Sequence, residues 1–187
     1  MAITGGSDFG WLDVELNTSD LDRLELSVLS PAAIKRIPSR AINETTAWIK
    51  SRLLRELPSA TGLPRKNLLG RVRQGMASAN LNAIITGKVW LGIKPIDAMA
   101  LKDEGAIDSG YMAGGFYFKG GFKAVTKSGH TGIFARISKA RLPIRRQNVR
   151  IDSFANEVVR RLIPQAEQQL SSRTQRLIGF ELERATR

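Results

Sequence analysis

The sequence predicts an α+β fold in which an antiparallel sheet is flanked by two long helices, one in the N-terminal half and one at the C-terminal end. Three observations favour this class. Residues 32–57 carry apolar side chains at three- and four-residue steps, as an amphipathic helix does. Residues 152–170 repeat that spacing, and short segments between the two alternate apolar and polar residues, as strands do. Helices on either side of a run of strands are typical of an α+β domain.

Length and composition limit the classes of protein further. A chain of 187 residues that is 42% hydrophobic is long enough to bury a core. It has no cysteine and a single histidine, which excludes a disulfide framework, thiolate chemistry and a histidine-rich metal site. The N-terminus lacks the basic start and apolar run of a signal peptide, and no apolar window approaches the length of a membrane span. We therefore expect a soluble protein of cytoplasmic origin.

The net charge of +12 is unevenly distributed. Residues 1–30 contain six acidic residues and one arginine, which leaves that segment at −5 and the remainder at +17. We divide the chain accordingly into an acidic N-terminal arm at 1–30 and an α+β domain at 31–187. The asymmetry suggests either nucleic acid near the basic part or an acidic arm that docks on a basic neighbour. A basic surface without a specific ligand is the third alternative.

The first elements follow from local patterns. Residues 12–16 alternate apolar and acidic side chains, which predicts a short half-buried strand, and 18–24 predict a short capped helix. The apolar stripe of the helix at 32–57 is expected to be covered by a sheet or by a neighbouring subunit. Pro38 lies inside it and predicts a bend, or a restart of the helix with Ser39 as N-cap.

The middle of the chain changes period. Residues 82–86 and 89–93 predict two strands joined by a turn at 87–88. Residues 94–121 are rich in glycine and form the least regular segment, so we predict a long functional loop or an interaction arm there. Only its end, the Gly-Gly-Phe-Tyr-Phe run, is expected to begin a strand.

The clearest hairpin signal surrounds the only histidine. Residues 122–127 and 133–137 flank the turn Ser128-Gly-His-Thr-Gly132, which predicts two antiparallel strands with His130 exposed at the tip. Beyond a basic segment, Asp152 is expected to cap the last helix, whose apolar stripe continues to Leu170.

Catalytic groups are hard to assemble from this sequence. His130 is expected at an exposed tip, where water competes with proton transfer. The acidic residues near residue 100 show no metal-ligand pattern, and the glycines match neither a dinucleotide fingerprint nor a phosphate loop. We therefore predict no enzymatic activity, no metal and no cofactor.

Basic and aromatic residues suggest contacts with partners instead. Phosphate binding needs only cationic side chains, so the candidate contacts with DNA or with an acidic partner are Arg141, Arg145, Arg146 and Arg150. The aromatic residues of the glycine-rich loop could be core residues or partner anchors. The candidate subunit-interface residues are Trp11, Leu12, Tyr111, Phe116 and Tyr117.

Several segments, taken in order, resemble the minor tail protein Z family of phages and prophages. They are AINETTAWIKSRLLREL, LPRKNLLGRVR, AGGFYF, GIFARISKARLPI and the last amphipathic helix, and together they cover roughly residues 31–180. The most specific block is 132–144, whose matching residues are Phe134, Arg136, Lys139, Arg141, Pro143 and Ile144. Ala41-Ile42-Asn43 and Gly115-Phe116 are supporting matches. The acidic arm matches less well, so its role is not implied by the family.

The resemblance implies a structural virion protein that completes the tail and helps to join it to the head. It further implies an α+β fold like that of tail-completion and head–tail-joining proteins, and assembly into a homo-oligomeric ring around the DNA channel, which in a tail would be a hexamer. The implied partners are other tail or neck proteins (tail terminator, tail tube, connector) and DNA in the channel. The implied location is the tail or neck of a virion assembled in the host bacterial cytoplasm. The alternative function is a stand-alone basic module that binds the phosphate backbone of nucleic acid.

Overall fold

The computed structural model describes residues 2–5, 11–17, 30–79, 84–102 and 104–186. The chain forms two compact units. Unit 1 comprises Met1–Leu53, Arg71–Gly92 and Asn156–Arg187, and unit 2 comprises Leu54–Gly70 and Ile93–Ala155. These boundaries differ from the predicted division at residue 30. The predicted short helix at 18–24 lies outside the described residues.

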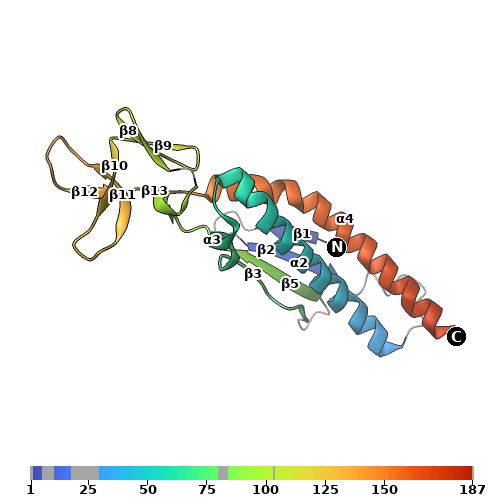
Figure 1. Cartoon of the computed structure of the whole chain (residues 1–187). Coiled ribbons are helices and arrows are strands. Elements are labelled where there is room, and N and C mark those ends of the chain that lie inside the picture. The colour runs from blue at the N-terminus through green and yellow to red at the C-terminus, as the bar shows by residue number, and fades with distance from the viewer. Residues whose placement is uncertain (1, 6–10, 18–29, 80–83, 103, 187) are drawn as a thin grey trace. The chain divides into compact units, whose positions relative to one another are not determined.

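Unit 1 contains a five-stranded sheet in the order β1-β2-β5-β3, with β4 also paired to β5 (Figure 1). Every pairing in it is antiparallel. Its strands are β1 (Ala2–Gly5), β2 (Trp11–Asn17), β3 (Val72–Gln74), β4 (Ser78–Ala79) and β5 (Ile84–Leu91). The predicted strand at 12–16 is confirmed as β2. Because β2 pairs along its whole length with β5, this part of the acidic segment belongs to the sheet of unit 1 and is not a separate arm.

The predicted turn at 87–88 is wrong, because β5 runs through it as one strand. Alternate residues Ile85, Gly87, Val89 and Leu91 are all buried on one face. A Cβ at Gly87 would lie only 2.3 Å from Cγ2 of Ile42. This glycine therefore serves a close approach between the helix that carries Ile42 and the sheet, and it does not mark a turn.

That helix is α2 (Pro31–Thr61), which is longer than predicted by a few residues at its C-terminal end. The predicted apolar stripe is confirmed, since Ile37, Ile42, Ile49 and Leu53 are at most 2% exposed. The helix does not restart at Ser39. The hydroxyl of Ser39 donates a hydrogen bond to the carbonyl of Lys35 at 3.1 Å, as in an uninterrupted helix, and does not cap a new one.

The last helix, α4 (Asp152–Ala185), is confirmed and continues through the C-terminal segment. One stripe of it is buried, and the members of that stripe are Ala155, Val158, Leu162, Ala166, Leu170, Thr174 and Leu177. In unit 1, α2 and α4 run antiparallel and side by side (Figure 1). Two ion pairs between them show this order, since Arg36 pairs with Glu181 and Glu44 pairs with Arg176. The prediction of an antiparallel sheet flanked by these two helices is confirmed.

Unit 2 consists of short elements. Its helices are α3 (Arg65–Leu69) and the 3-10 helix η2 (Ala98–Ala100). Its strands are β6 (Ile96–Asp97), β7 (Gly105–Ile107), β8 (Gly110–Ala113), β9 (Phe116–Lys119), β10 (Gly121–Val125), β11 (Thr131–Arg136), β12 (Ile144–Arg146) and β13 (Asn148–Val149). They form the antiparallel sheets β7-β8-β9, β10-β11-β12 and β6-β13.

The predicted irregular loop at 94–121 is therefore wrong, because it contains four of these strands and the 3-10 helix. Its glycines make tight turns instead of a flexible arm. Gly114 and Gly115 have φ values of +56° and +81° and join β8 to β9. The predicted strand start in the Gly-Gly-Phe-Tyr-Phe run is confirmed as β9, and the hairpin around residues 128–132 is confirmed as β10 and β11.

Candidate functional site

The candidate site is a basic hairpin of unit 2 (Arg136–Arg146), formed by the end of β11, an exposed loop and β12. Residues 109–151 contain nine lysine or arginine residues and no aspartate or glutamate. Arg136 lies opposite Ile144, Ala135 opposite Arg145 and Phe134 opposite Arg146. The hairpin therefore presents a local excess of positive charge on a short, regular scaffold.

The base of the hairpin is fixed by packing and by backbone hydrogen bonds. Phe134 is buried and its ring lies 6.5 Å from that of Phe122 on β10. The guanidinium of Arg136 lies 6.0 Å from the centre of the Phe122 ring, which is within the range of a cation–π contact. The N–H of Gln147 donates to the carbonyl of Ile133 at 2.8 Å and holds the end of β12 against β11.

Two of the four predicted cationic contacts are already paired inside unit 2. Arg146 forms an ion pair with Asp97, and Nη2 of Arg150 lies 2.8 Å from Oδ2 of Asp152. The hydrogen bond from Arg150 lowers the pKa of the Asp152 carboxyl, because it favours the charged form. Each of these two arginines therefore already has a carboxylate partner within unit 2.

The other two predicted cations, Arg141 and Arg145, are exposed. Within the described part of the chain, no carboxylate pairs with either of them, nor with Lys139 in the same loop. Lys139 was missed as a site residue, although it lies between the predicted strands of an acid-free segment. The structure thus groups three unpaired cations on the loop and on β12.

The loop of the basic hairpin also exposes apolar side chains. Ile137 is 55% exposed and Leu142 is 67% exposed. The N–H of Ile137 donates to the carbonyl of Pro143 at 3.3 Å and closes the loop. A depression beside it is lined by Ala135, Arg136, Ile137, Arg145 and Gln147. The site therefore combines cations with a small apolar surface.

The predicted subunit-interface residues of unit 1 separate onto two faces of the sheet. Trp11 is 40% exposed and lies directly opposite Trp90, which is 43% exposed. Leu12 is only 2% exposed and lies in the core, because successive strand residues point to opposite faces. The prediction is therefore wrong for Leu12, whereas Trp11 presents an exposed surface. Trp90 was missed because its strand was divided at residue 87.

The predicted interface residues of unit 2 separate in the same way. Tyr111 is 6% exposed and belongs to the core, so it offers no surface to a partner. Phe116 is half-buried against Phe154, with the two rings 5.8 Å apart and perpendicular. Tyr117 is 49% exposed, and its hydroxyl lies 3.0 Å from that of Ser109. Of these three residues, only Tyr117 presents a largely exposed side chain.

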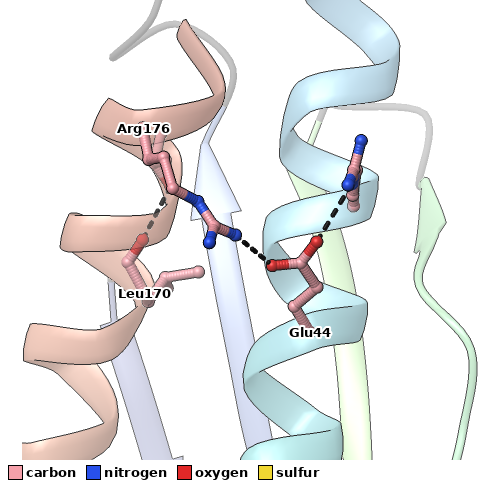
Figure 2. A network of polar contacts seen from close by, with 5 residues as sticks. Glu44, Leu170 and Arg176 are labelled. Carbon is pink, nitrogen blue, oxygen red and sulfur yellow. Dashed lines mark hydrogen bonds and ion pairs between the residues drawn. The ribbon is translucent and has the colours of Figure 1, made fainter. Parts of the chain in front are cut away.

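A second cluster of charges lies between α2 and α4 in unit 1 (Figure 2). The Glu44 carboxylate accepts hydrogen bonds from Arg40 at 3.0 Å and from Arg176 at 2.8 Å. Burial lowers the pKa of the nearby Arg173 guanidinium, and the negative charge of Glu44 opposes that effect. Nη1 of Arg173 is buried and has no hydrogen-bond partner among the described residues. This cluster ties two helices together, so we assign it a structural role.

His130 lies at the exposed tip of the β10–β11 hairpin, as predicted. Its backbone N–H donates to the hydroxyl of Thr126 at 3.2 Å, and its carbonyl accepts from the Thr126 N–H at 2.9 Å. Across the described ranges, no three histidine, cysteine, aspartate or glutamate side chains are grouped so that they could hold a metal ion. None of the described helices is long and apolar enough to cross a membrane.

Comparisons with known proteins add no relative. No family model matches the chain, and neither the search of curated proteins nor that of solved structures found a match.

Proposed function

We propose that this chain is a structural phage virion protein, a minor tail or tail-completion protein that acts in tail assembly and head–tail joining. It works without catalysis, by packing copies of itself and neighbouring tail or neck proteins into a ring around the DNA channel. The resemblance in sequence suggests this function. It is supported by a difference among the resembling residues: some maintain the fold, whereas others are exposed on the basic hairpin.

Some of the resembling residues maintain the fold. Ala41 and Ile42 are fully buried in α2. Oδ1 of Asn43 accepts a hydrogen bond from the N–H of Ala77 at 2.8 Å, and its carbonyl accepts one from the Gln74 amide. Gly115 adopts a left-handed turn that few other residues tolerate. These positions would be needed in any chain with this fold, whatever its function.

The most specific block of the resemblance behaves differently, and this observation carries the proposal. Residues 132–144 comprise most of β11, the loop of the basic hairpin and the first residue of β12. Phe134 is in the core, whereas Arg136, Lys139 and Arg141 are exposed. No packing or ion pair of the described residues accounts for Lys139 or Arg141. Binding residues are found disproportionately on loops that a regular scaffold positions, as Lys139 and Arg141 are here.

The surface of unit 1 offers a complementary kind of contact. Trp11 and Trp90 occupy opposing positions on β2 and β5 and are both exposed. The Lys88 ammonium lies 5.8 Å from the Trp11 ring, and the Arg73 guanidinium lies 5.9 Å from the Trp90 ring. Tryptophan and arginine are enriched among the residues that dominate binding at protein interfaces. A contact between unlike surfaces of successive copies closes into a ring when the rotation allows it.

The proposal is tested on particles from a bacterium that encodes the chain. Purified tails are expected to contain this polypeptide in a small, fixed copy number by mass spectrometry, and electron microscopy should locate it at the junction of head and tail. Trp11→Ser combined with Trp90→Ser should lower the yield of complete particles. Met76→Ser changes another exposed apolar residue and serves as the control. Complete particles that lack the polypeptide would contradict the proposal.

The alternative, a stand-alone nucleic-acid-binding module, is favoured by one observation, the acid-free stretch at 109–151. It predicts binding that persists near physiological salt or depends on base sequence, without any association with tails. Weak, sequence-independent binding at low salt is expected of any protein with a charge of +12 and does not favour it.

A further inference from the structure

We propose that the basic hairpin binds duplex DNA through the phosphate backbone, with Lys139, Arg141 and Arg145 as the contacting residues. The inference deepens the proposed function by naming the partner of this surface, and it rests on that function only for its biological setting. Arg146 and Arg150 are not contact residues in this proposal, because Asp97 and Asp152 already balance their charges.

The first argument is charge. The hairpin lies in a stretch of 43 residues, 109–151, that has no carboxylate of its own. Among the described residues, no carboxylate forms an ion pair with Lys139, Arg141 or Arg145. Unpaired cations held close together repel one another, and a polyanion removes that repulsion when it binds. Binding to phosphates also releases the counterions condensed on DNA, which supplies most of the affinity of such contacts.

The second argument is the distribution of the cations around the hairpin. Successive residues of a strand point to opposite faces. Since Arg145 lies opposite Ala135 while Arg136 lies opposite Ile144, the side chains of Arg136 and Arg145 project from opposite faces of the β10-β11-β12 sheet. Arg136 lies against Phe122 on one face, so the proposed phosphate contacts are made by Arg145 on the other face and by Lys139 and Arg141 in the loop between β11 and β12.

The third argument concerns the exposed apolar side chains. Ile137 and Leu142 lie on either side of Lys139 and Arg141 in a loop closed by the bond between residues 137 and 143. Proteins that bind in the minor groove of DNA often combine arginine or lysine with isoleucine, leucine or proline, which wedge between base steps. The loop has this composition and is exposed.

The contacts should be independent of base sequence. The loop of the hairpin offers lysine and arginine as its long polar side chains. The side-chain amide of Gln147, the residue after β12, donates a hydrogen bond to the carbonyl of Arg145 at 3.1 Å. Phosphate contacts position a protein but carry no sequence information. We therefore expect similar affinities for duplexes of different sequence and equal length.

The test compares two triple variants of the full chain with the same net charge of +9. The hairpin variant is Lys139→Gln/Arg141→Gln/Arg145→Gln. The control variant is Lys35→Gln/Arg55→Gln/Arg160→Gln, which changes three exposed cations elsewhere. The affinity for a 20-base-pair duplex is measured by fluorescence anisotropy from 50 to 200 mM salt.

The affinity falls as the salt concentration rises. In the hairpin variant, the slope of log affinity against log salt should be shallower by about 2.7, which is about 0.9 for each phosphate contact removed. Over this fourfold range of salt, the affinity of the unmodified chain should then fall about 40-fold more than that of the hairpin variant. The control variant should keep a slope within about 1 of the unmodified chain. Equal losses in the two variants would overturn the proposal, because they would show an effect of net charge alone.

Two further probes distinguish other partners. Vesicles with anionic phosphatidylserine and a polyglutamate of matched charge replace the duplex at the same salt concentrations. The proposal would be overturned if the unmodified chain bound one of these probes more tightly than DNA and the hairpin variant lost that binding. The partner would then be a membrane for the vesicles or an acidic protein for polyglutamate. A circular dichroism spectrum of each variant establishes that the fold is kept.

The outcome is independent of the test of the proposed function. If tails contain the polypeptide but the hairpin variant binds DNA like the control variant, the DNA contact is wrong and the tail function stands. If the hairpin variant alone loses binding but complete particles lack the polypeptide, the DNA contact stands and the tail function is wrong.

Discussion

In unit 1, long stretches of α2 and α4 pack with a five-stranded sheet, whereas in unit 2 no described strand is longer than six residues. The two units also differ in charge. Unit 1 contains 15 basic and 11 acidic residues, and unit 2 contains 14 basic and 6 acidic residues. Unit 1 therefore holds the longer helices and strands with its charges closer to balance, and unit 2 carries most of the uncompensated charge.

The aromatic residues allow the two units to be followed separately. All three tryptophans, Trp11, Trp48 and Trp90, belong to unit 1, and both tyrosines, Tyr111 and Tyr117, belong to unit 2. Tryptophan fluorescence therefore reports unfolding of unit 1. Tyrosine signals in the near-ultraviolet circular dichroism spectrum, after subtraction of the tryptophan bands, report unfolding of unit 2.

The largest effect is expected from removing a core side chain in each unit. Ile49 in unit 1 and Ile133 in unit 2 are both fully buried, and replacing a buried isoleucine by alanine costs about 2–5 kcal/mol. The cost depends on how far the surroundings collapse into the cavity. We expect about 4 kcal/mol for Ile49→Ala in the long helix α2 and about 2 kcal/mol for Ile133→Ala in the short strand β11, where the surroundings should collapse further.

Urea unfolding followed by the two aromatic signals measures both costs. Ile49→Ala should shift the tryptophan transition and Ile133→Ala the tyrosine transition. If both variants shifted both transitions by the same amount, the two units would unfold as one and the comparison between them would fail.

The next effect distinguishes a glycine that provides space from one that provides a backbone conformation. Gly87→Ala places a Cβ 2.3 Å from Ile42 and 3.0 Å from Thr46, so we expect overpacking to cost about 1–3 kcal/mol. Adding Ile42→Ala should recover part of that loss.

In unit 2, Gly115 has open space around its Cβ position but a φ of +81°. Gly115→Ala should cost about 1–2 kcal/mol, and Gly115→Asn less, because asparagine tolerates this conformation better.

Gly179 provides the control for both changes. It lies in α4 with no atom within 4 Å of its Cβ position, so Gly179→Ala should stabilise unit 1 by about 0.5–1 kcal/mol. Thermal unfolding measures all of these variants. A stabilising Gly87→Ala would refute the close approach of α2 to β5.

The secondary structure could be predicted from the sequence where a long element repeats its apolar residues at a regular spacing. The stripes of α2 and α4 were predictable because an amphipathic helix is the regular structure that places residues three and four positions apart on one face. The β10–β11 hairpin was predictable from its Ser-Gly-His-Thr-Gly turn. The division of β5 was an error, because a glycine under a helix and a glycine in a turn are identical in the sequence. The short strands at 94–121 span too few residues to display a period.

The candidate site was predictable only in part, for a related reason. The basic composition of the hairpin is visible in the sequence, but the pairing of its members is not. Arg146 is neutralised by Asp97, which lies far away in the chain and is brought close only by the pairing of β6 with β13. The burial of Leu12 and Tyr111 could not be predicted for a similar reason. The burial of a strand residue depends on which face of the sheet is covered by a helix or loop that is distant in the sequence.

A smaller effect is expected from the charge cluster of unit 1 (Figure 2). Glu44→Gln leaves Arg40, Arg173 and Arg176 close together without a carboxylate. Exposed ion pairs contribute about 0–1 kcal/mol, and Glu44 is 30% exposed, so we expect a loss of about 1 kcal/mol. The loss should be larger at low salt, because salt screens the repulsion among the guanidinium groups. Glu167→Gln, an exposed control on α4, should have no measurable effect in the same urea titration.

The smallest effect concerns the Arg150–Asp152 pair of unit 2. The hydrogen bond from Arg150 lowers the pKa of Asp152, so the folded state releases this proton more readily than the unfolded state. The resulting stabilisation is complete above the ordinary pKa of an aspartate, about 3.9, and is lost as the pH falls through the lowered value. Arg150→Gln should therefore raise the pKa of Asp152 and lower the melting temperature slightly at pH 6. Below both pKa values the two proteins should melt alike, because Asp152 is then protonated in each.

Arg150→Lys, which keeps the charge, should retain part of the pKa shift in an NMR titration of the Asp152 carboxyl. An unchanged titration in Arg150→Gln would mean that this arginine is not engaged with Asp152 and is available, with Lys139, Arg141 and Arg145, to an external anion.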